Sequence, residues 1–121
     1  MEIREERHGE VAVLTPAGDV DATTLPQFER RVDRLLRQGV RGILFDLGAV
    51  GILPSAGVGF LLQTARRLQE KDGAIGLTGA SGLVRATLRT LGVTDVFPLH
   101  DSRESALREL ATRLAPKPAE S

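Results

Sequence analysis

The 121-residue sequence contains no cysteine, no tryptophan and no tyrosine. Without cysteine the chain has no disulfide framework and no thiolate nucleophile or metal ligand. Its only aromatic residues are four phenylalanines, which leaves few side chains that could stack on nucleic-acid bases. Sixteen basic residues balance sixteen acidic ones, so no net charge attracts the protein to nucleic acid. These absences argue against direct nucleic-acid binding.

Long apolar runs are also missing. Residues 1–7 are mostly charged and lack the apolar stretch of a signal peptide. The longest apolar run, residues 58–62, falls far short of the roughly eighteen residues of a membrane span. We therefore expect a cytoplasmic protein without membrane insertion.

The residues that are present suit one folded domain. Apolar residues make up 41% of the chain and are nearly all aliphatic, and charged residues make up 26%. We predict a single domain over residues 1–115. Residues 116–121 contain two prolines that do not continue a helix, so we predict a flexible C-terminal tail there.

Apolar periodicity predicts strands that alternate with helices. An antiparallel edge strand near residues 3–7 should turn at His8-Gly9 into an inner strand near 11–15. Further strands are predicted near residues 42–47, 74–78 and 96–99. Helices are predicted over about residues 25–38, 56–71, 81–91 and 102–114. This alternation predicts an α/β fold with a mostly parallel sheet of four to five strands and about four helices.

Three details of these helices can be tested directly. Thr24 and Gln27 have the spacing of a capping box at the start of the first helix. Ser55 is expected to be the N-cap of the second helix. In the third helix, Val84, Leu88 and Leu91 are expected to point inward.

Enzyme motifs are incomplete in this chain. Residues 53–57 resemble the nucleophile elbow G-x-S-x-G, and Asp95 and His100 follow Ser55 in the order of a hydrolase triad. However, Leu53 replaces the first glycine of that motif, and the chain is too short for such a fold. A dinucleotide fingerprint that begins at Gly57 lacks its third glycine.

No metal site is indicated either. The two histidines, His8 and His100, have no acidic residue at ligand spacing. We therefore expect a protein that is not an enzyme, with no catalytic residue, no cofactor and no metal.

Two segments remain as candidate binding sites. Gly57 and Gly59 weaken the first turn of the second helix, expose backbone N–H groups and leave room beside Ser55 for a partner or a phosphate. The simpler interpretation is that Ser55 only caps the helix. In residues 18–23, Asp21 either caps the following turn or contacts a partner.

At these segments the sequence resembles the anti-sigma factor antagonists, which are single STAS domains of bacterial partner-switching systems. The resemblance extends from Ile3 to Leu114. Residues 16–23 (PAGDVDAT) are similar to the family's G-x-[LV]-D-x-x-T motif. FDL at residues 45–47 and ILPSAGVG at residues 52–59 are similar to its F-D-L and D-S-S-G-L-G blocks. The segment from Leu91 to Leu107 is similar to its C-terminal portion.

The resemblance implies a function. In the family, the unphosphorylated domain binds an anti-sigma factor that is also an ATP-dependent serine kinase, and a sigma factor is thereby freed. The kinase phosphorylates the first serine of the D-S-S-G block, and a phosphatase reverses the modification. By position that serine is Ser55, and the motif aspartate is Asp21. The implied partner-binding residues are Asp21, Ala22, Thr23, Pro54, Ser55, Ala56, Gly57 and Val58.

Two positions depart from the family pattern. Pro54 replaces the aspartate before the serine, and Ala56 replaces the second serine. These changes leave an alternative open. The chain could be a non-switching STAS scaffold of a stress-sensing assembly, or the STAS subunit of a lipid-transport ATPase.

Overall fold

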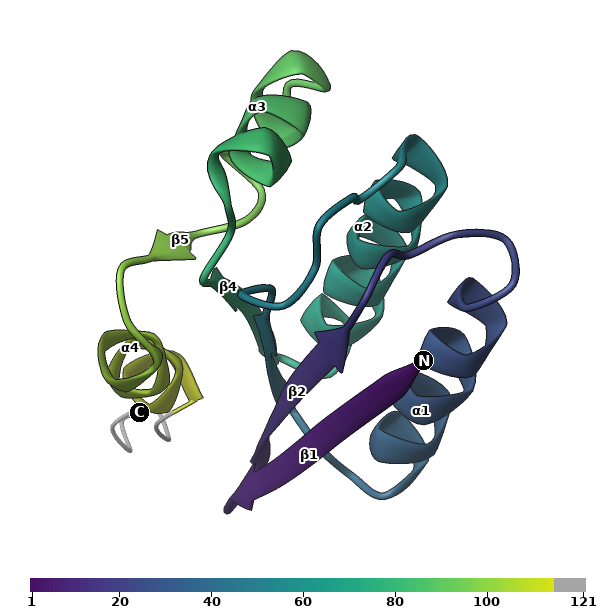
Figure 1. The fold of residues 1–121 in the computed structure, drawn as a ribbon. Helices are drawn as coiled ribbons and strands as arrows, with labels where there is room; N and C mark the ends of the chain where they lie inside the picture. Colours follow the sequence, from purple (N-terminus) through teal and green to yellow (C-terminus); the bar gives the residue numbers. More distant parts are fainter. Residues whose placement is uncertain (115–121) are drawn as a thin grey trace, which may run out of the picture.

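A five-stranded sheet in the order β1-β2-β3-β4-β5 forms the centre of the structure, a computed structural model that describes residues 1–114 (Figure 1). β1 pairs antiparallel with β2, and every other neighbouring pair is parallel. The strands are β1 (Glu2–His8), β2 (Val11–Ala17), β3 (Gly42–Asp46), β4 (Ala74–Thr78) and β5 (Leu99–His100). The mostly parallel sheet is confirmed. The predicted tail, residues 116–121, lies outside the described residues.

Four helices cover the two faces of this sheet. They are α1 (Leu25–Arg37), α2 (Ser55–Gln69), α3 (Gly82–Thr90) and α4 (Arg103–Leu114). Figure 1 shows α4 on the side of the sheet opposite to α1 and α2. The side chains of β2 divide in the same way, because Val11 and Val13 pack with α4 whereas Ala12 and Leu14 belong to the other core. The α/β fold with four helices is confirmed.

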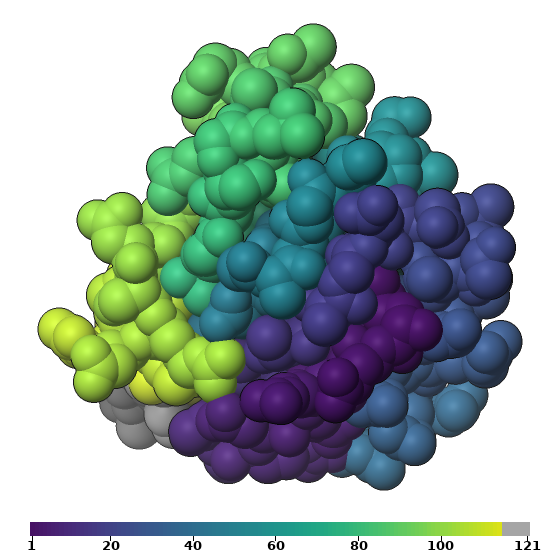
Figure 2. All heavy atoms as spheres, viewed as in Figure 1, coloured from purple at the N-terminus to yellow at the C-terminus, as the bar shows by residue number. Residues whose placement is uncertain are grey.

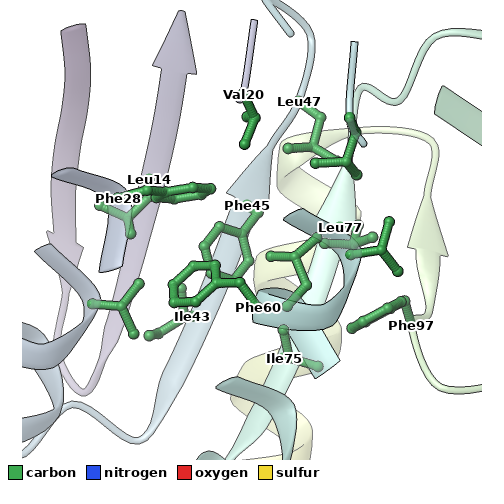
Figure 3. Packing of buried hydrophobic residues seen from close by; sticks show 14 of the residues in the cluster. Leu14, Val20, Phe28, Ile43, Phe45, Leu47, Phe60, Ile75, Leu77 and Phe97 are labelled. Carbon is green, nitrogen blue, oxygen red and sulfur yellow. The ribbon is translucent and has the colours of Figure 1, made fainter. Parts of the chain in front are cut away.

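Aromatic and aliphatic side chains fill the larger core, between the sheet and α1, α2 and α3 (Figure 3). The ring of Phe28 from α1 meets Phe45 from β3 edge to face at 5.4 Å between centroids, and Phe60 from α2 at 5.2 Å. Val20 and Leu47, from the loops that follow β2 and β3, lie at the end of the same core. The core therefore holds the starts of both loops in place.

Two predicted boundaries are wrong. The last strand is confined to Leu99–His100, because the backbone N–H groups of Val96 and Phe97 both donate to the carbonyl of Val93 and close a turn. The first hairpin turns at Gly9-Glu10, while His8 still pairs with Val11. Gly9 has a φ of 65°, a conformation that glycine adopts without strain.

Two predicted side-chain roles are also wrong. Thr24 is the N-cap of α1 but makes no side-chain cap hydrogen bond, and the Gln27 side chain accepts one from the N-terminal amine of Met1. The capping box is therefore not formed. Leu91 follows the last turn of α3 and is 43% exposed, whereas Val84 and Leu88 are buried as predicted.

Candidate functional site

Two loops at the carboxyl end of the sheet carry the residues that the sequence singled out. The loop after β2 and the loop after β3 lie side by side because their strands are parallel neighbours. Two backbone hydrogen bonds join them, from Gly18 N to Ala49 O at 2.9 Å and from Val20 N to Ile52 O at 3.2 Å. These two bonds bring the Asp21 segment and the segment that leads to Ser55 together.

Asp21 organises the turn that leads into α1. Its Oδ1 accepts hydrogen bonds from the backbone N–H groups of Thr23 at 2.9 Å and Thr24 at 3.0 Å. Its own N–H donates to Thr24 Oγ1 at 2.9 Å. Within residues 1–114 its other oxygen, Oδ2, accepts no hydrogen bond, and the residue is exposed. Asp21 therefore caps the turn with one oxygen and presents the other to solvent.

The same hydrogen bonds make the stability of the fold depend on pH. Donation from the Thr24 N–H, and then from that of Thr23, lowers the pKa of the Asp21 carboxyl below its ordinary value. A carboxylate with a lowered folded-state pKa stabilises the fold above its ordinary pKa and loses that contribution as the pH falls through the lowered value.

We expect Asp21→Asn to lose less stability than the wild type across this acid range, measured by thermal melts in a pH series. Asp95→Asn is the matched control, since Asp95 is exposed and makes no hydrogen bond in the described part of the chain; equal acid sensitivity of wild type and Asp21→Asn would contradict the assignment.

Ser55 is the first residue of α2, not its N-cap. Pro54 is the N-cap, with φ of −72° and ψ of 169°, and it has no side-chain acceptor to offer the helix. Among residues 1–114 the Ser55 hydroxyl makes no hydrogen bond, and the residue is exposed. The predicted cap bond is thus absent because the helix begins one residue earlier. Ser55 is therefore an exposed residue at a helix N-terminus.

The glycines after Ser55 have different roles. A Cβ on Gly57 would lie 2.8 Å from Leu53 Cδ1 and 3.2 Å from Val20 Cγ1, so this glycine lets both loops pack on the helix. A Cβ on Gly59 would meet nothing within 4 Å. Gly57 and Val58, which were both predicted to contact a partner, are buried in the free protein.

Four of the predicted partner-binding residues line one groove of about 500 Å³, which we call the Asp21 groove. Its walls are mostly apolar, and Asp21 and Glu29 provide carboxylates. The lining residues are Val20, Asp21, Ala22, Leu25, Pro26, Glu29, Pro54 and Ala56. The other four lining residues, Val20, Leu25, Pro26 and Glu29, were not predicted from the sequence, although Leu25 and Glu29 are four residues apart and so share one face of α1. Thr23 is exposed outside this groove, and Ser55 faces a different groove beside α3.

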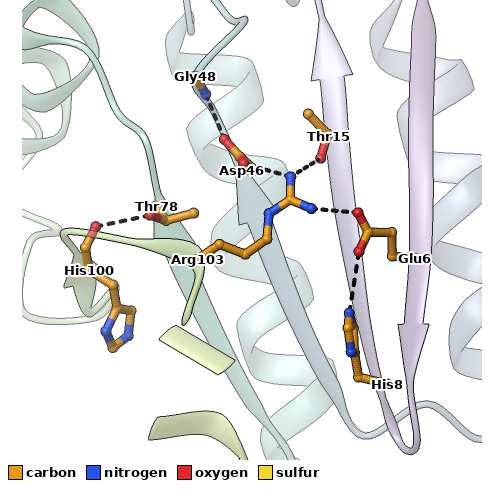
Figure 4. A network of polar contacts seen from close by, with 8 residues as sticks. All are labelled: Glu6, His8, Thr15, Asp46, Gly48, Thr78, His100 and Arg103. Atoms are coloured by element: carbon orange, nitrogen blue, oxygen red, sulfur yellow. Dashed lines mark hydrogen bonds and ion pairs between the residues drawn. The ribbon is translucent and has the colours of Figure 1, made fainter. Parts of the chain in front are cut away.

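A polar network holds the start of the loop that leads from β3 to Ser55 (Figure 4). Asp46, at the end of β3, accepts a hydrogen bond from Gly48 N at 3.0 Å with Oδ1 and from Arg103 at 2.9 Å with Oδ2. Arg103 also pairs with Glu6 at 2.6 Å and donates to Thr15 at 3.2 Å. The bond to Asp46 is the main cause that raises the pKa of Arg103. The first turn of α4 is thereby tied to β1, β2 and β3.

Within the described residues, the side chains that a hydrolase triad or a metal site would require are not brought together. His100 Nε2 is buried without a hydrogen-bond partner there, and no bond joins Ser55 to a base, so the hydrolase arrangement is not formed. No cluster of three or more His, Asp or Glu side chains that could hold a metal ion occurs within residues 1–114. No helix in this range is both long and apolar enough to span a membrane.

The chain belongs to the STAS domain family, whose sequence model matches residues 2–106. The match includes both loops, the first turn of α2 and the whole sheet. The family membership predicted from the sequence motifs is confirmed.

Proteins similar to this chain include anti-sigma factor antagonists. BtrV of Bordetella bronchiseptica is 29% identical over 97 residues, which cover 80% of this chain and 84% of that protein. RsfB of Mycobacterium tuberculosis, an anti-sigma-F factor antagonist, is 25% identical over 100 residues, which cover 83% of this chain and 81% of RsfB. The unphosphorylated form of the Bacillus anti-sigma factor antagonist SpoIIAA has the same fold, with a TM-score of 0.81 at 21% identity over 92% of this chain and 97% of SpoIIAA.

Proposed function

We propose that this protein is an anti-sigma factor antagonist that binds its anti-sigma partner through the Ser55 end of the molecule and is released when Ser55 is phosphorylated. One observation supports this most strongly. Ser55 is an exposed serine with a free hydroxyl at the first position of a helix, beside a groove with apolar walls and a carboxylate rim. The similarity to RsfB, an anti-sigma-F factor antagonist, supports the same class of partner.

Local electrostatics explain how a phosphate would act. A phosphoserine carries about −1.5 to −2 charges at neutral pH, and a helix N-terminus tolerates that charge without unfolding. Residues 9–29 and 42–65, which contain both loops, include no lysine or arginine. Carboxylates border the site instead, with Asp21 and Glu29 in the Asp21 groove. In a docked surface the added charge would lose water with no basic group of these loops to neutralise it, and this would oppose binding without a rearrangement of the fold.

The proposed partner is an anti-sigma factor with serine kinase activity, and a phosphatase would reset the protein. Pro54 does not prevent this, because it holds the N-cap position in an extended conformation and leaves the Ser55 hydroxyl exposed. Pro54 and Ala56 both line the Asp21 groove, so the two departures from the family motif change the wall of that groove. We infer that they change which anti-sigma factor is bound.

The test is a phosphorylation assay with the candidate anti-sigma factor and ATP, followed by intact mass measurement. The wild type should gain the mass of one phosphate, and Ser55→Ala should gain none. Equal phosphorylation of both proteins would contradict the assignment of Ser55. Absence of phosphate on either protein, together with tight binding, would favour the non-switching scaffold or the transporter subunit.

Asp21→Asn separates the two roles of Asp21. Asparagine keeps an oxygen for the Thr23 and Thr24 N–H groups but removes the negative charge and the second acceptor. We expect partner affinity to fall about tenfold, as for the loss of one charge-assisted hydrogen bond, with a melting temperature at neutral pH slightly below that of the wild type, because the contribution of the ionised carboxylate to stability is lost. Asp21→Ala is the comparison variant and should lose both affinity and stability. Wild-type affinity in Asp21→Asn would show that the residue serves the turn alone.

A further inference from the structure

The outer face of α1 is built mainly from arginine. Arg30, Arg34 and Arg37 follow one another at intervals of four and three residues, so they lie on one side of the helix. The buried Phe28 and Val32 lie on the opposite side. A hollow of about 550 Å³ runs among the outer side chains. We call this surface the arginine face, and its residues are Gln27, Arg30, Arg31, Asp33, Arg34 and Arg37. Figure 2 shows α1 (blue) at the edge of the molecule, beside β1 (purple).

Few carboxylates neutralise this face. Glu5 of β1 is shared between two of its arginines, since Oε1 of Glu5 lies 3.3 Å from Arg31 and 3.6 Å from Arg34. Asp33, the one acidic residue of the face, pairs at 2.6 Å with Arg67 of α2. The arginine face therefore keeps an excess of positive charge, although the net charge of the chain is zero.

Two of the arginines have no partner in the part of the chain that the structure describes. Arg30 and Arg37 are exposed, and among residues 1–114 their side chains form no ion pair and no hydrogen bond. Arg30 also forms a like-charge pair with Arg34 at a spacing of four residues, which costs helix stability. Stability of the fold therefore does not explain why these arginines are gathered on one face.

The length of the arginine face indicates the kind of ligand that would fit. The helical rise places Arg30 and Arg37 about 10 Å apart along the helix axis. A single small anion does not reach across this distance, whereas an acidic segment with a carboxylate at every third or fourth residue does. Guanidinium groups stay charged and bind carboxylates with two parallel hydrogen bonds.

Two other polyanions fit this face less well. All four phenylalanines of the chain are buried, so no aromatic ring is available to stack on nucleic-acid bases. A membrane surface needs an apolar anchor beside the basic groups. The large hydrophobic side chains that are strongly exposed in residues 1–114 are Ile52, Leu83, Leu91 and Val96, and none belongs to α1 or β1. An acidic protein segment is thus the ligand that these observations favour.

The arginine face begins next to the Asp21 groove. Pro26 lines that groove, and Arg30 lies one turn further along the same side of α1. We infer that the arginine face is a second contact for the anti-sigma partner and receives an acidic segment of it. The inference rests on the proposed function and extends it. A partner with a basic group near Asp21 and carboxylates along α1 would match the charge of both surfaces.

Binding kinetics with the purified anti-sigma partner over a series of NaCl concentrations test the inference. Arg30→Glu and Arg37→Glu should each slow association about tenfold at low salt and weaken its dependence on salt, because the introduced carboxylate repels those of the partner. The matched control is Arg108→Glu, which makes the same change of charge at an exposed position of α4, on the other side of the sheet. It should slow association by no more than about twofold. Melting curves should stay close to that of the wild type, since neither Arg30 nor Arg37 has an ion pair to lose in the described residues.

Carbodiimide cross-linking then identifies the groups that meet the arginine face. Arg37→Lys keeps the positive charge and supplies an amine, which carbodiimide joins to a neighbouring carboxylate as an amide. Peptide mass spectrometry should find the introduced lysine joined to an aspartate or glutamate of the partner. Arg108→Lys is the control and should give no such link. Equal yields from the two variants would contradict the inference.

The outcomes distinguish this inference from the proposed function. If Arg30→Glu and Arg37→Glu associate as Arg108→Glu does while Ser55→Asp binds weakly, the arginine face is not a docking site and the phosphorylation switch stands. If the wild type does not bind the partner, both proposals fail.

Other ligands of the arginine face would be revealed by the same variants. Sedimentation with phosphatidylglycerol vesicles, or binding of a DNA oligonucleotide, that is lost in Arg30→Glu while the partner still binds normally would assign the face to a membrane or to nucleic acid. A change in the oligomeric state of the free protein alone would assign it to a second copy of the chain. Each of these results would overturn the inference.

Discussion

Ser55→Asp is expected to bind the anti-sigma partner about 10- to 100-fold more weakly than the wild type, while Ser55→Ala binds equally well. The carboxylate adds a negative charge at the helix start, where it is compatible with folding. It also lies next to a surface with carboxylates and apolar walls, where it opposes docking. Titration calorimetry measures the affinities, and melting curves confirm that both variants are folded.

Ser55→Ala is a suitable control because Ser55, contrary to the sequence-based prediction, is not the N-cap of α2. As the predicted N-cap, Ser55 would stabilise the helix by about 1 kcal/mol. In the structure its hydroxyl makes no cap bond, so the change to alanine should alter stability by less than about 0.5 kcal/mol. If both Ser55 variants bound as the wild type does, the non-switching scaffold or transporter subunit would be the better assignment.

Gly79→Ala should lower the free energy of unfolding by roughly 2–4 kcal/mol. Gly79 follows β4 and has a φ of 74°, which strains any residue with a Cβ. A Cβ there would also lie 2.8 Å from Asp46 Oδ1 and 2.9 Å from Gly48 N. These are the two atoms whose hydrogen bond begins the loop to Ser55. We therefore expect partner affinity to fall together with stability, as measured by chemical denaturation and by titration.

Gly59→Ala is the matched control for that substitution. Gly59 lies inside α2, is exposed and has open space around its Cα. Alanine at such a site should raise stability by about 0.5–1 kcal/mol. A loss of stability similar to that of Gly79→Ala would show that glycine substitution in general, and not the contact with Asp46 and Gly48, causes the effect.

Much of the fold could be predicted because its strands carry strong local signals. The apolar runs of β2 and β3 indicate inner strands, and parallel strands bring the ends of both to the same edge of the sheet. The Asp21 loop packs beside the segment that leads to Ser55 as a consequence of this arrangement of the strands. The last strand was predicted least accurately, because Val96 and Phe97 have strand propensity but form a local turn before β5.

The details of the site depended on long-range packing that no local pattern contains. Leu91 continues the apolar spacing of Val84 and Leu88, yet α3 ends before it and leaves the side chain exposed. Arg103 contacts Asp46 across 57 positions of sequence, and its spacing gave no hint of that contact. The walls of both grooves come from separate elements, so each groove exists only once these elements are packed together.

The most direct measurement is the affinity of the purified anti-sigma partner for the protein carrying phosphoserine at position 55, compared with the unmodified protein. Incorporating phosphoserine during synthesis keeps the comparison independent of any kinase. We predict tight binding of the unmodified protein and binding at least about 100-fold weaker after phosphorylation, with a melting temperature that shows the fold intact. Equal affinity of the two forms, both folded, would contradict a phosphorylation switch at Ser55.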